Sequence, residues 1–146
     1  MGKAADAVRS SSSPSPPSGF SNKLTLEKVL GLSTIHNSCF TVNPTTGELA
    51  YAAGSVVVVY SARRNRQVRF FRASKTVSSC VFSHDGKYLA IGESGHKPAV
   101  IVWDLSTGAV MSELKGHKFG ISSLVSGGDC SGNFLRVFLP GCQPNF

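Results

Sequence analysis

Charged residues are scarce in this sequence, tryptophan occurs once, and no long apolar run is present. Asp, Glu, Lys and Arg make up 16% of the 146 residues, against roughly 25% in an average soluble domain. Together with the 15 glycines, this shortage excludes a long charged helix and a coiled coil. Because 41% of the residues are hydrophobic, the chain can bury a core and is not wholly disordered. No stretch approaches the ~20 apolar residues of a membrane-spanning helix.

The sequence also has no signal peptide and no closely spaced cysteines. Its N-terminus lacks the apolar stretch of a secretory signal. No CxxC pair occurs among Cys39, Cys80, Cys130 and Cys142. We therefore expect reduced thiols and a protein of the cytoplasm or the nucleus.

Catalytic and cofactor motifs are absent as well. The sequence contains neither GxGxxG nor GxxxxGK followed by Ser or Thr, the two glycine-rich phosphate loops. No clear nucleophile or carboxylate partner accompanies the histidines, which are His36, His84, His96 and His117. A zinc site made of His117, Cys130 and Cys142 would lack the usual ligand spacing. The sequence thus predicts a non-enzymatic protein without a cofactor or a metal.

Composition divides the chain into three parts. Residues 1–22 are rich in Ser and Pro without hydrophobic periodicity, and are predicted to be a disordered tail. Residues 23–125 alternate short apolar runs with turn residues. Residues 126–146 begin with a glycine-rich stretch and lose this alternation, so they are assigned to a divergent C-terminal tail.

The middle part has the pattern of an all-β protein. Its runs are rich in Val, Phe, Tyr and Ile, and no segment keeps a helical period for the roughly ten residues that a helix requires. Strands are predicted near residues 24–30, 38–42, 48–53, 55–60, 66–71, 77–82, 87–92, 99–103, 109–114 and 120–125. Phe134–Phe138 is a further candidate strand, which the sequence pattern does not decide.

The predicted strands recur with a period. Ser83–Ile91 repeats Asn43–Tyr51 after one gap, and Val100–Trp103 repeats Val57–Tyr60. A four-strand unit that recurs at about 40–45 residues is the signature of a β-propeller blade. The predicted blades cover about residues 34–75 and 76–119, and a third begins at residue 120.

Motifs at the blade ends resemble those of WD repeats. Trp103-Asp104 ends the third strand of the second repeat, Gly116-His117 opens the next repeat, and Asp85-Gly86 lies in the turn after a first strand. In this order and at this period, the motifs are typical of the WD-repeat family. The resemblance implies a propeller fold, with structural roles for Trp103, Asp104, Gly116, His117, Asp85 and Gly86.

Longer stretches are similar to one group of WD-repeat proteins. Leu24–Leu32, Gly54–Tyr60, Gly92–His96 and His117–Gly120 resemble the N-terminal part of the mitogen-activated-protein-kinase-binding scaffolds, which include the microcephaly-associated spindle-pole protein. The resemblance implies a scaffold that binds other proteins, such as signalling kinases, in the cytoplasm and at the cytoskeleton or spindle. The long kinase-binding C-terminal region of those scaffolds has no match here, so kinase binding is not assigned to individual residues.

The second repeat departs from the hydrogen-bond network of that family, which links a His, a Ser or Thr, an Asp and the Trp. Ser74 stands at the His position, Ile91 stands at the Ser/Thr position, and the turn Glu93–Pro98 has no Asp. His96 is a candidate partial substitute. In the first repeat, Tyr60-Ser61 replaces Trp-Asp. We therefore expect the blades to depend more on apolar packing than on this network.

Two blades and the start of a third do not close a propeller, which needs about 4–8 blades. The sequence therefore indicates an incomplete propeller, either a short isoform, a fragment or an incomplete gene model. Because adjacent repeats stabilise one another, we expect the 146-residue chain to be unstable, self-associating or chaperone-bound. The residues expected to lose a neighbour are Val81, Leu89, Ile101 and Leu114.

A basic cluster supplies the candidate partner-binding residues, which are Arg63, Arg64, Arg66, Arg69, Arg72 and Lys75. On an outer strand such a cluster is either a solvated edge that discourages aggregation or a docking patch for an acidic protein, a nucleic acid or an anionic surface. Phe70 and Phe71 are adjacent and point to opposite faces of a strand, which disfavours base stacking. A protein-interaction scaffold is therefore preferred, with a nucleic-acid-binding β-domain as the alternative.

Overall fold

The computed structural model describes residues 25–33, 37–129 and 132–138. Within these residues the one helix is a short 3-10 turn, η1 (Asn37–Cys39), and no helix is long and apolar enough to cross a membrane. The strands are β1 (Phe40–Val42), β2 (Leu49–Ala53), β3 (Val56–Ser61), β4 (Arg66–Arg72), β5 (Val77–Phe82), β6 (Tyr88–Glu93), β7 (Val100–Asp104), β8 (Val110–Leu114), β9 (Ser123–Asp129) and β10 (Gly132–Phe138).

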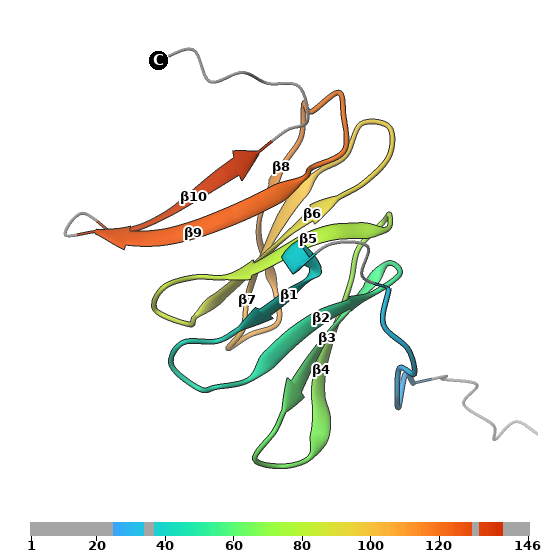
Figure 1. Cartoon of the computed structure of the whole chain (residues 1–146), viewed down its shortest axis with the longest axis vertical. Helices are drawn as coiled ribbons and strands as arrows, with labels where there is room; N and C mark the ends of the chain where they lie inside the picture. Colours follow the sequence, from blue (N-terminus) through green and yellow to red (C-terminus); the bar gives the residue numbers. More distant parts are fainter. Residues whose placement is uncertain (1–24, 34–36, 130–131, 139–146) are drawn as a thin grey trace, which may run out of the picture.

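The strands form three antiparallel sheets. The first sheet has the order β1-β2-β3-β4, the second sheet has the order β5-β6-β7-β8, and β9 pairs with β10 in the third sheet. The sheets follow one another from the bottom to the top of Figure 1, and β5 contacts both β1 and β9. The prediction of an all-β, incomplete propeller with two four-stranded units and the start of a third is confirmed. The predicted tail at residues 1–22 lies outside the described residues.

Hydrogen bonds join the segments that begin successive sheets. Cys39 Sγ donates to Ser78 O at 2.9 Å, and Ser78 Oγ donates to Ile121 O at 2.6 Å. Leu124 N donates to the buried Ser79 Oγ at 3.0 Å. The partners are 39, 43 and 45 residues apart in the chain. The period of the sequence therefore appears in the structure as contacts between neighbouring repeats.

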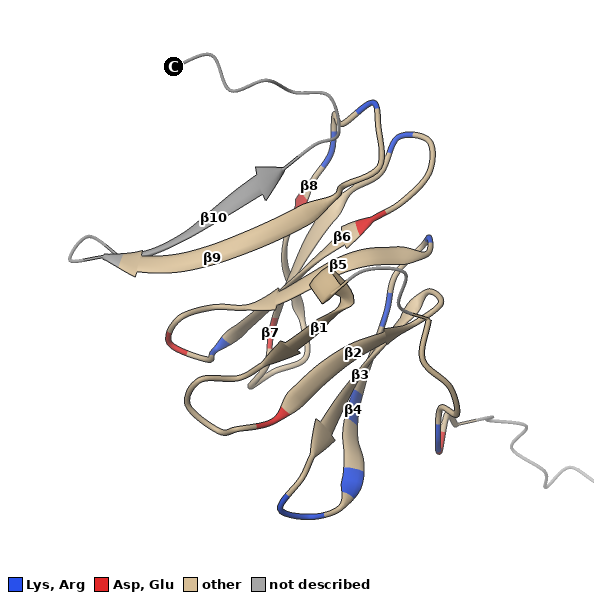
Figure 2. Cartoon of the chain, in the orientation of Figure 1, with Lys and Arg blue, Asp and Glu red and all other residues tan. Residues whose placement is uncertain are grey.

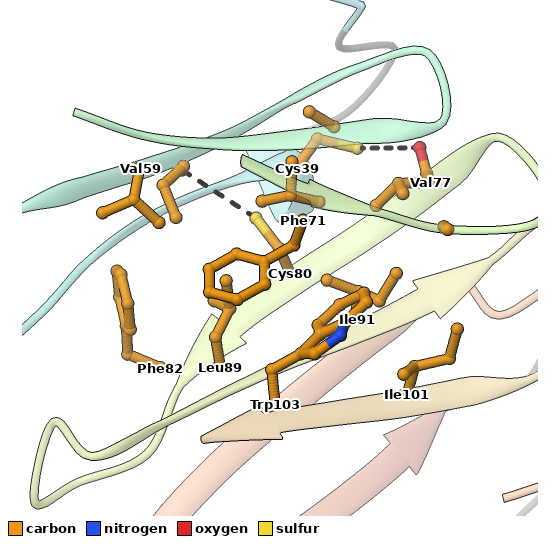
Figure 3. Packing of buried hydrophobic residues seen from close by; sticks show 14 of the residues in the cluster. Cys39, Val59, Phe71, Val77, Cys80, Phe82, Leu89, Ile91, Ile101 and Trp103 are labelled. Carbon is orange, nitrogen blue, oxygen red and sulfur yellow. Dashed lines mark hydrogen bonds between the residues drawn. The ribbon is translucent and has the colours of Figure 1, made fainter. Parts of the chain in front are cut away.

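The main core lies between the first and second sheets. Val57 and Phe71 from the first sheet meet Leu89, Ile91 and Trp103 from the second sheet, and all five are buried. Figure 3 shows Phe71 directed toward Trp103, and the centroids of their rings lie 5.2 Å apart with the planes tilted by 33°. Trp103 is 4% exposed, as the sequence predicts for a central strand of a packed blade.

A smaller core joins the second sheet to the third. It contains Ala90, Val100, Ile121 and Leu124. A Cβ added at Gly92 would lie 2.6 Å from Ile121 Cγ2, so the glycine provides the space that this isoleucine fills. The exposed strand β8 has no such cover, since Val110, Met111 and Leu114 are each 45% exposed or more. Self-association of the chain stays a prediction, and these side chains are the ones that would support it.

The strand predicted at residues 24–30 is wrong for the part that the structure describes. Residues 25–33 have no regular structure, and Leu30 is 83% exposed. The side-chain amide of Gln67, on β4, makes the contacts that a neighbouring strand would make. Gln67 Nε2 donates to Val29 O at 2.6 Å, and Val29 N donates to Gln67 Oε1 at 2.9 Å. A side chain thus fixes one residue of the segment without extending the sheet.

Strand pairing continues beyond residue 125, where the sequence pattern ends. β9 reaches Asp129 and pairs with β10 along its whole length, which includes the open candidate at Phe134–Phe138. The glycines that look like turn residues lie within the strand. A Cβ added at Gly128 would lie 2.8 Å from His84 Cδ2, so this glycine leaves room for the imidazole.

Candidate partner-binding surfaces

The two equivalent turns of the first and second sheets are bound to each other. The buried Asn43 donates from Nδ2 to Gly86 O at 2.9 Å, and Thr45 Oγ1 donates to Asp85 O at 3.1 Å. Asn43 Oδ1 accepts from Thr45 N at 2.9 Å. Asn43 therefore shapes its own turn and holds the neighbouring one. The sequence analysis missed this role, although the repeat alignment sets the two turns in register.

Asp85 and Gly86 shape the turn between β5 and β6. Asp85 Oδ1 accepts from Ser83 Oγ at 2.6 Å and from Lys87 N at 3.1 Å, which closes the turn between β5 and β6. Gly86 has φ +70, a left-handed conformation that glycine adopts without strain. A Cβ at this position would overlap Asn43 Oδ1 and lie 2.8 Å from Thr45 Oγ1.

Gly86→Ala is expected to cost about 3 kcal/mol of unfolding free energy, because the left-handed backbone costs ~1–2 kcal/mol and overpacking adds at least ~1 kcal/mol. Gly47→Ala is the matched control, since Gly47 has φ +71 and nothing within 4 Å of an added Cβ. Urea unfolding followed by circular dichroism measures both variants. Equal losses in the two variants would contradict a tight contact between the turns.

Glu93, at the end of β6, makes a polar network in the second repeat. Its side chain is 2% exposed. Oε1 accepts from Ser74 N at 3.0 Å and from Lys75 N at 3.1 Å, and Oε2 accepts from Ala99 N at 3.1 Å. The second repeat therefore has a polar network of its own at this end, in addition to the apolar core. A lone acid at the end of an apolar strand was the signal available in the sequence.

The expectation that His96 partly takes the place of the missing residues of the family's hydrogen-bond network is wrong. The His96 ring is exposed, and the hydrogen bond at this residue uses its backbone carbonyl, which accepts from Lys75 Nζ at 2.5 Å. Ile91 is fully buried in the main core, as an apolar residue at a Ser/Thr position would be. The polar contacts at this end are thus made by Glu93 and not by His96, which the sequence analysis offered as a partial substitute.

The WD-type residues do not form one cluster. Asp104 ends β7 and accepts at Oδ1 from Ser106 Oγ at 2.6 Å and Ser106 N at 2.7 Å, and these bonds hold the pKa of the carboxyl below its usual value. Gly116 is exposed with φ +112, and His117 is half-buried. His117 lines the same hollow as Ala99, which precedes β7, whereas Trp103 lies near the end of β7 and does not line that hollow.

The basic cluster occupies the turn before β4, the strand β4 itself and the residues after it (Figure 2). The five arginines Arg63, Arg64, Arg66, Arg69 and Arg72 are all exposed, and Lys75 is half-buried. In the part of the chain that the structure describes, the ion pairs join Lys87 to Asp85 and Lys115 to Glu113. The arginines of this edge are thus available to a partner.

The structure divides this cluster among different surfaces. Arg64 and Arg69 line one hollow of about 680 Å³ between the first and second sheets, which we call the arginine hollow. Arg66 faces a different hollow, beside Tyr51 and Tyr60. Lys75 Nζ donates to the carbonyls of His96 and Lys97 at 2.5 Å each, at the opposite end of the sheet. Of the six candidates, Arg64 and Arg69 share the arginine hollow, and Arg63 and Arg64 share a smaller hollow of about 330 Å³.

Cys39 and Cys80 are both buried, and Cys80 is a free thiol. Burial, and then the neighbouring Cys39, raise the pKa of Cys80 to about 12. Cys80 Sγ lies 3.9 Å from Ala50 O, to which it donates. A thiol with this pKa is protonated at neutral pH and is a poor nucleophile. Cys130 and Cys142, the other members of the zinc set considered above, lie outside the residues whose side chains are described.

Four-stranded antiparallel units that recur at this period and pack face to face are the blades of a WD-repeat propeller. Solved structures that resemble the chain have this fold. The WD40 repeats of RRP9 match 60% of this chain and 28% of that chain, with TM-score 0.53 and 23% identity. A chain of the mitotic checkpoint complex matches over 84% and 38%, with TM-score 0.55 and 19% identity.

The chain is a WD-repeat protein. It is 43% identical over 108 residues to WD repeat-containing protein 62 of Mus musculus, and 45% identical over 103 residues to Mitogen-activated protein kinase-binding protein 1 of Mus musculus. These matches cover 73% and 70% of this chain and 7% of each relative, so the chain spans about 7% of their length. They confirm the resemblance found in the motifs. No family model matches the sequence.

Proposed function

We propose that the chain is a non-catalytic protein-interaction scaffold of the WD-repeat type. The packed sheets supply a rigid frame, and the charged edges and loops supply the surfaces that partners contact. The side chains of Asn43 and Glu93 each make three hydrogen bonds, and these bonds hold turns and loops together. This arrangement supports a rigid platform rather than a reaction centre.

The observation that carries the proposal is the arginine hollow. Arg64 and Arg69 are exposed and line one hollow between two sheets, whose relative position is fixed by Asn43 and the Phe71–Trp103 contact. A guanidinium offers a planar fork that matches a carboxylate. Lys87 adds a third positive charge to the lining of the hollow, and the carboxylates of Glu48 and Asp104 offset two of the three positive charges. We assign this hollow to an acidic segment of a protein partner.

A mitogen-activated protein kinase is the first partner to test, because one relative is named for binding such a kinase. A role in kinase signalling or at the spindle follows from the same likeness and is part of the proposal. Nucleic-acid binding is the second outcome of the test. It is disfavoured by Phe71, which is 5% exposed and packs in the main core, where no base can stack on it.

Arg69→Glu is expected to weaken binding of a purified mitogen-activated protein kinase about tenfold, since loss of one close charge pair and gain of repulsion is worth ~1.4 kcal/mol. Arg72→Glu is the matched control, because Arg72 is equally exposed on β4 but does not line the arginine hollow. Biolayer interferometry measures both. Equal weakening by the two variants, or no binding of the wild-type chain, would contradict the assignment.

The same two variants distinguish binding of a protein partner from binding of a nucleic acid. A nucleic acid that binds through the whole basic edge would lose affinity equally with Arg69→Glu and Arg72→Glu, with a steep dependence on salt. Binding of unrelated single-stranded RNA at the affinity of the kinase would therefore favour a nucleic-acid-binding domain over a scaffold.

A further inference from the structure

The end of the molecule opposite the arginine hollow carries a second cationic surface, made of three loops. The loops follow β4, β6 and β8 and line a hollow of about 790 Å³, which we call the lysine hollow. Its charged lining contains four lysines and two glutamates, which are Lys75, Lys97, Lys115, Lys118, Glu93 and Glu113. Two of its loops carry the same tripeptide, Gly95-His96-Lys97 and Gly116-His117-Lys118.

Hydrogen bonds hold these loops in place. Ile121 N donates to Glu93 O at 3.1 Å, which joins the loop after β8 to the end of β6. Ser94 N donates to Thr76 O at 2.9 Å, which joins the loop after β6 to the loop after β4. A Cβ added at Gly120 would lie 3.5 Å from Gly95 N, so the two tripeptide loops run in contact. The hollow is therefore preorganised, which lowers the entropic cost of binding.

The negative charges in the lysine hollow are already engaged. The Glu93 carboxylate accepts three backbone N–H groups, and Glu113 forms an ion pair with Lys115 at 3.0 Å. Lys97 and Lys118 are exposed and belong to neither of the ion pairs in the described part of the chain. Lys97 is held at φ +49, an unusual conformation for a residue other than glycine, by a loop whose carbonyls accept from Lys75. The surface thus presents uncompensated positive charge.

An apolar side chain adjoins this charge. Phe119 follows Lys118, lines the same hollow and is 66% exposed. An exposed aromatic ring beside lysines fits a ligand that carries both carboxylates and an apolar side chain. The hollow is too large for one small anion, and it has the size of several side chains.

We propose that the lysine hollow binds a short acidic segment of a partner protein, with carboxylates on Lys97 and Lys118 and an apolar side chain on Phe119. The proposal deepens the scaffold function, on which it rests, because it adds a second docking surface at the opposite end of the sheets. A scaffold with two such surfaces can hold two partners at once.

The probe is a fluorescein-labelled peptide of twelve residues in which Glu alternates with Leu, titrated with the full 146-residue chain and read by fluorescence anisotropy. Lys97→Glu and Lys118→Glu are each expected to weaken binding about tenfold. Arg63→Glu is the matched control, with the same change of charge on an exposed residue outside this hollow, and it is expected to change affinity less than about twofold. Circular dichroism verifies that the variants are folded.

Two further titrations test the chemistry. Phe119→Ser is expected to weaken the Glu-Leu peptide but not a peptide of alternating Glu and Ser, and a peptide of alternating Lys and Leu is expected not to bind. Equal losses with Lys118→Glu and Arg63→Glu, or binding of the Lys-Leu peptide, would overturn the proposal. The kinase titration with Arg69→Glu is independent of this result. Failure of the peptide titrations would therefore not contradict the function proposed for the arginine hollow.

Discussion

Trp103→Ala is expected to cost about 3 kcal/mol of unfolding free energy, the lower end of the ~3–5 kcal/mol range for a buried tryptophan. Trp103 is 4% exposed, and its ring packs on Phe71 across the junction of the first two sheets. Alanine would leave a cavity at that junction and remove the aromatic contact. We expect the lower end because one side of the second sheet, at β8, is exposed and can relax.

Urea unfolding followed by far-ultraviolet circular dichroism measures this loss without depending on the tryptophan signal. Phe119→Ala is the control, because Phe119 is also aromatic but 66% exposed, and its substitution is expected to change stability by less than about 0.5 kcal/mol. A loss with Trp103→Ala no larger than that of the control would show that the first two sheets do not share a core.

Glu93→Ala is expected to cost about 3 kcal/mol or more, because it leaves the N–H groups of Ser74, Lys75 and Ala99 without their acceptor. A buried, unsatisfied donor costs ~1–3 kcal/mol; the hydrogen bond from Ala99 is buried, and those from Ser74 and Lys75 are partly buried. Glu93→Gln is expected to recover part of this loss, since its amide oxygen can still accept but its nitrogen cannot. The order of stability should therefore be wild type, then Gln, then Ala.

Amide hydrogen exchange gives the local signature of Glu93. In Glu93→Ala the amides of Ser74, Lys75 and Ala99 should exchange faster, while those at the Asn43–Gly86 turns should keep their protection. Glu113→Ala is the control, because Glu113 is exposed and pairs with Lys115 alone, and it is expected to change stability by less than about 0.5 kcal/mol. Unchanged exchange in Glu93→Ala would show that the carboxylate does not hold these loops.

The strands and their pairing were predictable from two features of the sequence. Apolar residues alternate with other residues along each strand, and the four-strand unit repeats along the chain. Val57 and Val59 alternate with residues of the opposite face, and Leu89 and Ile91 do the same in the next repeat. The turn at Asp85-Gly86 was also predictable from the sequence, because glycine readily adopts the left-handed backbone found at Gly86, and the side chain of Asp85 closes the turn. Such local rules need no knowledge of the neighbouring sheet.

The errors concern contacts between segments that are far apart in the sequence. The segment around Val29 looks like a strand, but its partner is the amide of Gln67, 38 residues away. Gly128 looks like a turn residue, but it lies within β9 against His84. Glu93 is visible in the sequence as a lone acid after an apolar run, but its three donors lie in the loops after β4 and β6. Nothing in the local pattern identifies such partners.

The candidate surfaces were predictable in charge but not in shape. The run from Arg63 to Lys75 is basic in the sequence, and the structure assigns Arg69, Arg66 and Lys75 to three different hollows. The alternation of a strand separates neighbours, and a bulge opposite Val59 and Tyr60 shifts the register of β4. Residues that cluster in the sequence thus need not cluster on the surface. Conversely, Lys97 and Lys118 are 21 residues apart in the sequence but line the same hollow, so the sequence analysis did not find it.

The packing of the first sheet on the second through Phe71 and Trp103 is the central claim, because the hollows and the scaffold role depend on it. A nuclear Overhauser experiment with ring-labelled phenylalanine tests it directly, since the chain has one tryptophan. The account predicts cross-peaks between the Trp103 indole and one phenylalanine ring, with centroids 5.2 Å apart, and their loss in Phe71→Leu. Cross-peaks that persist in Phe71→Leu, or an indole without phenylalanine neighbours, would contradict it.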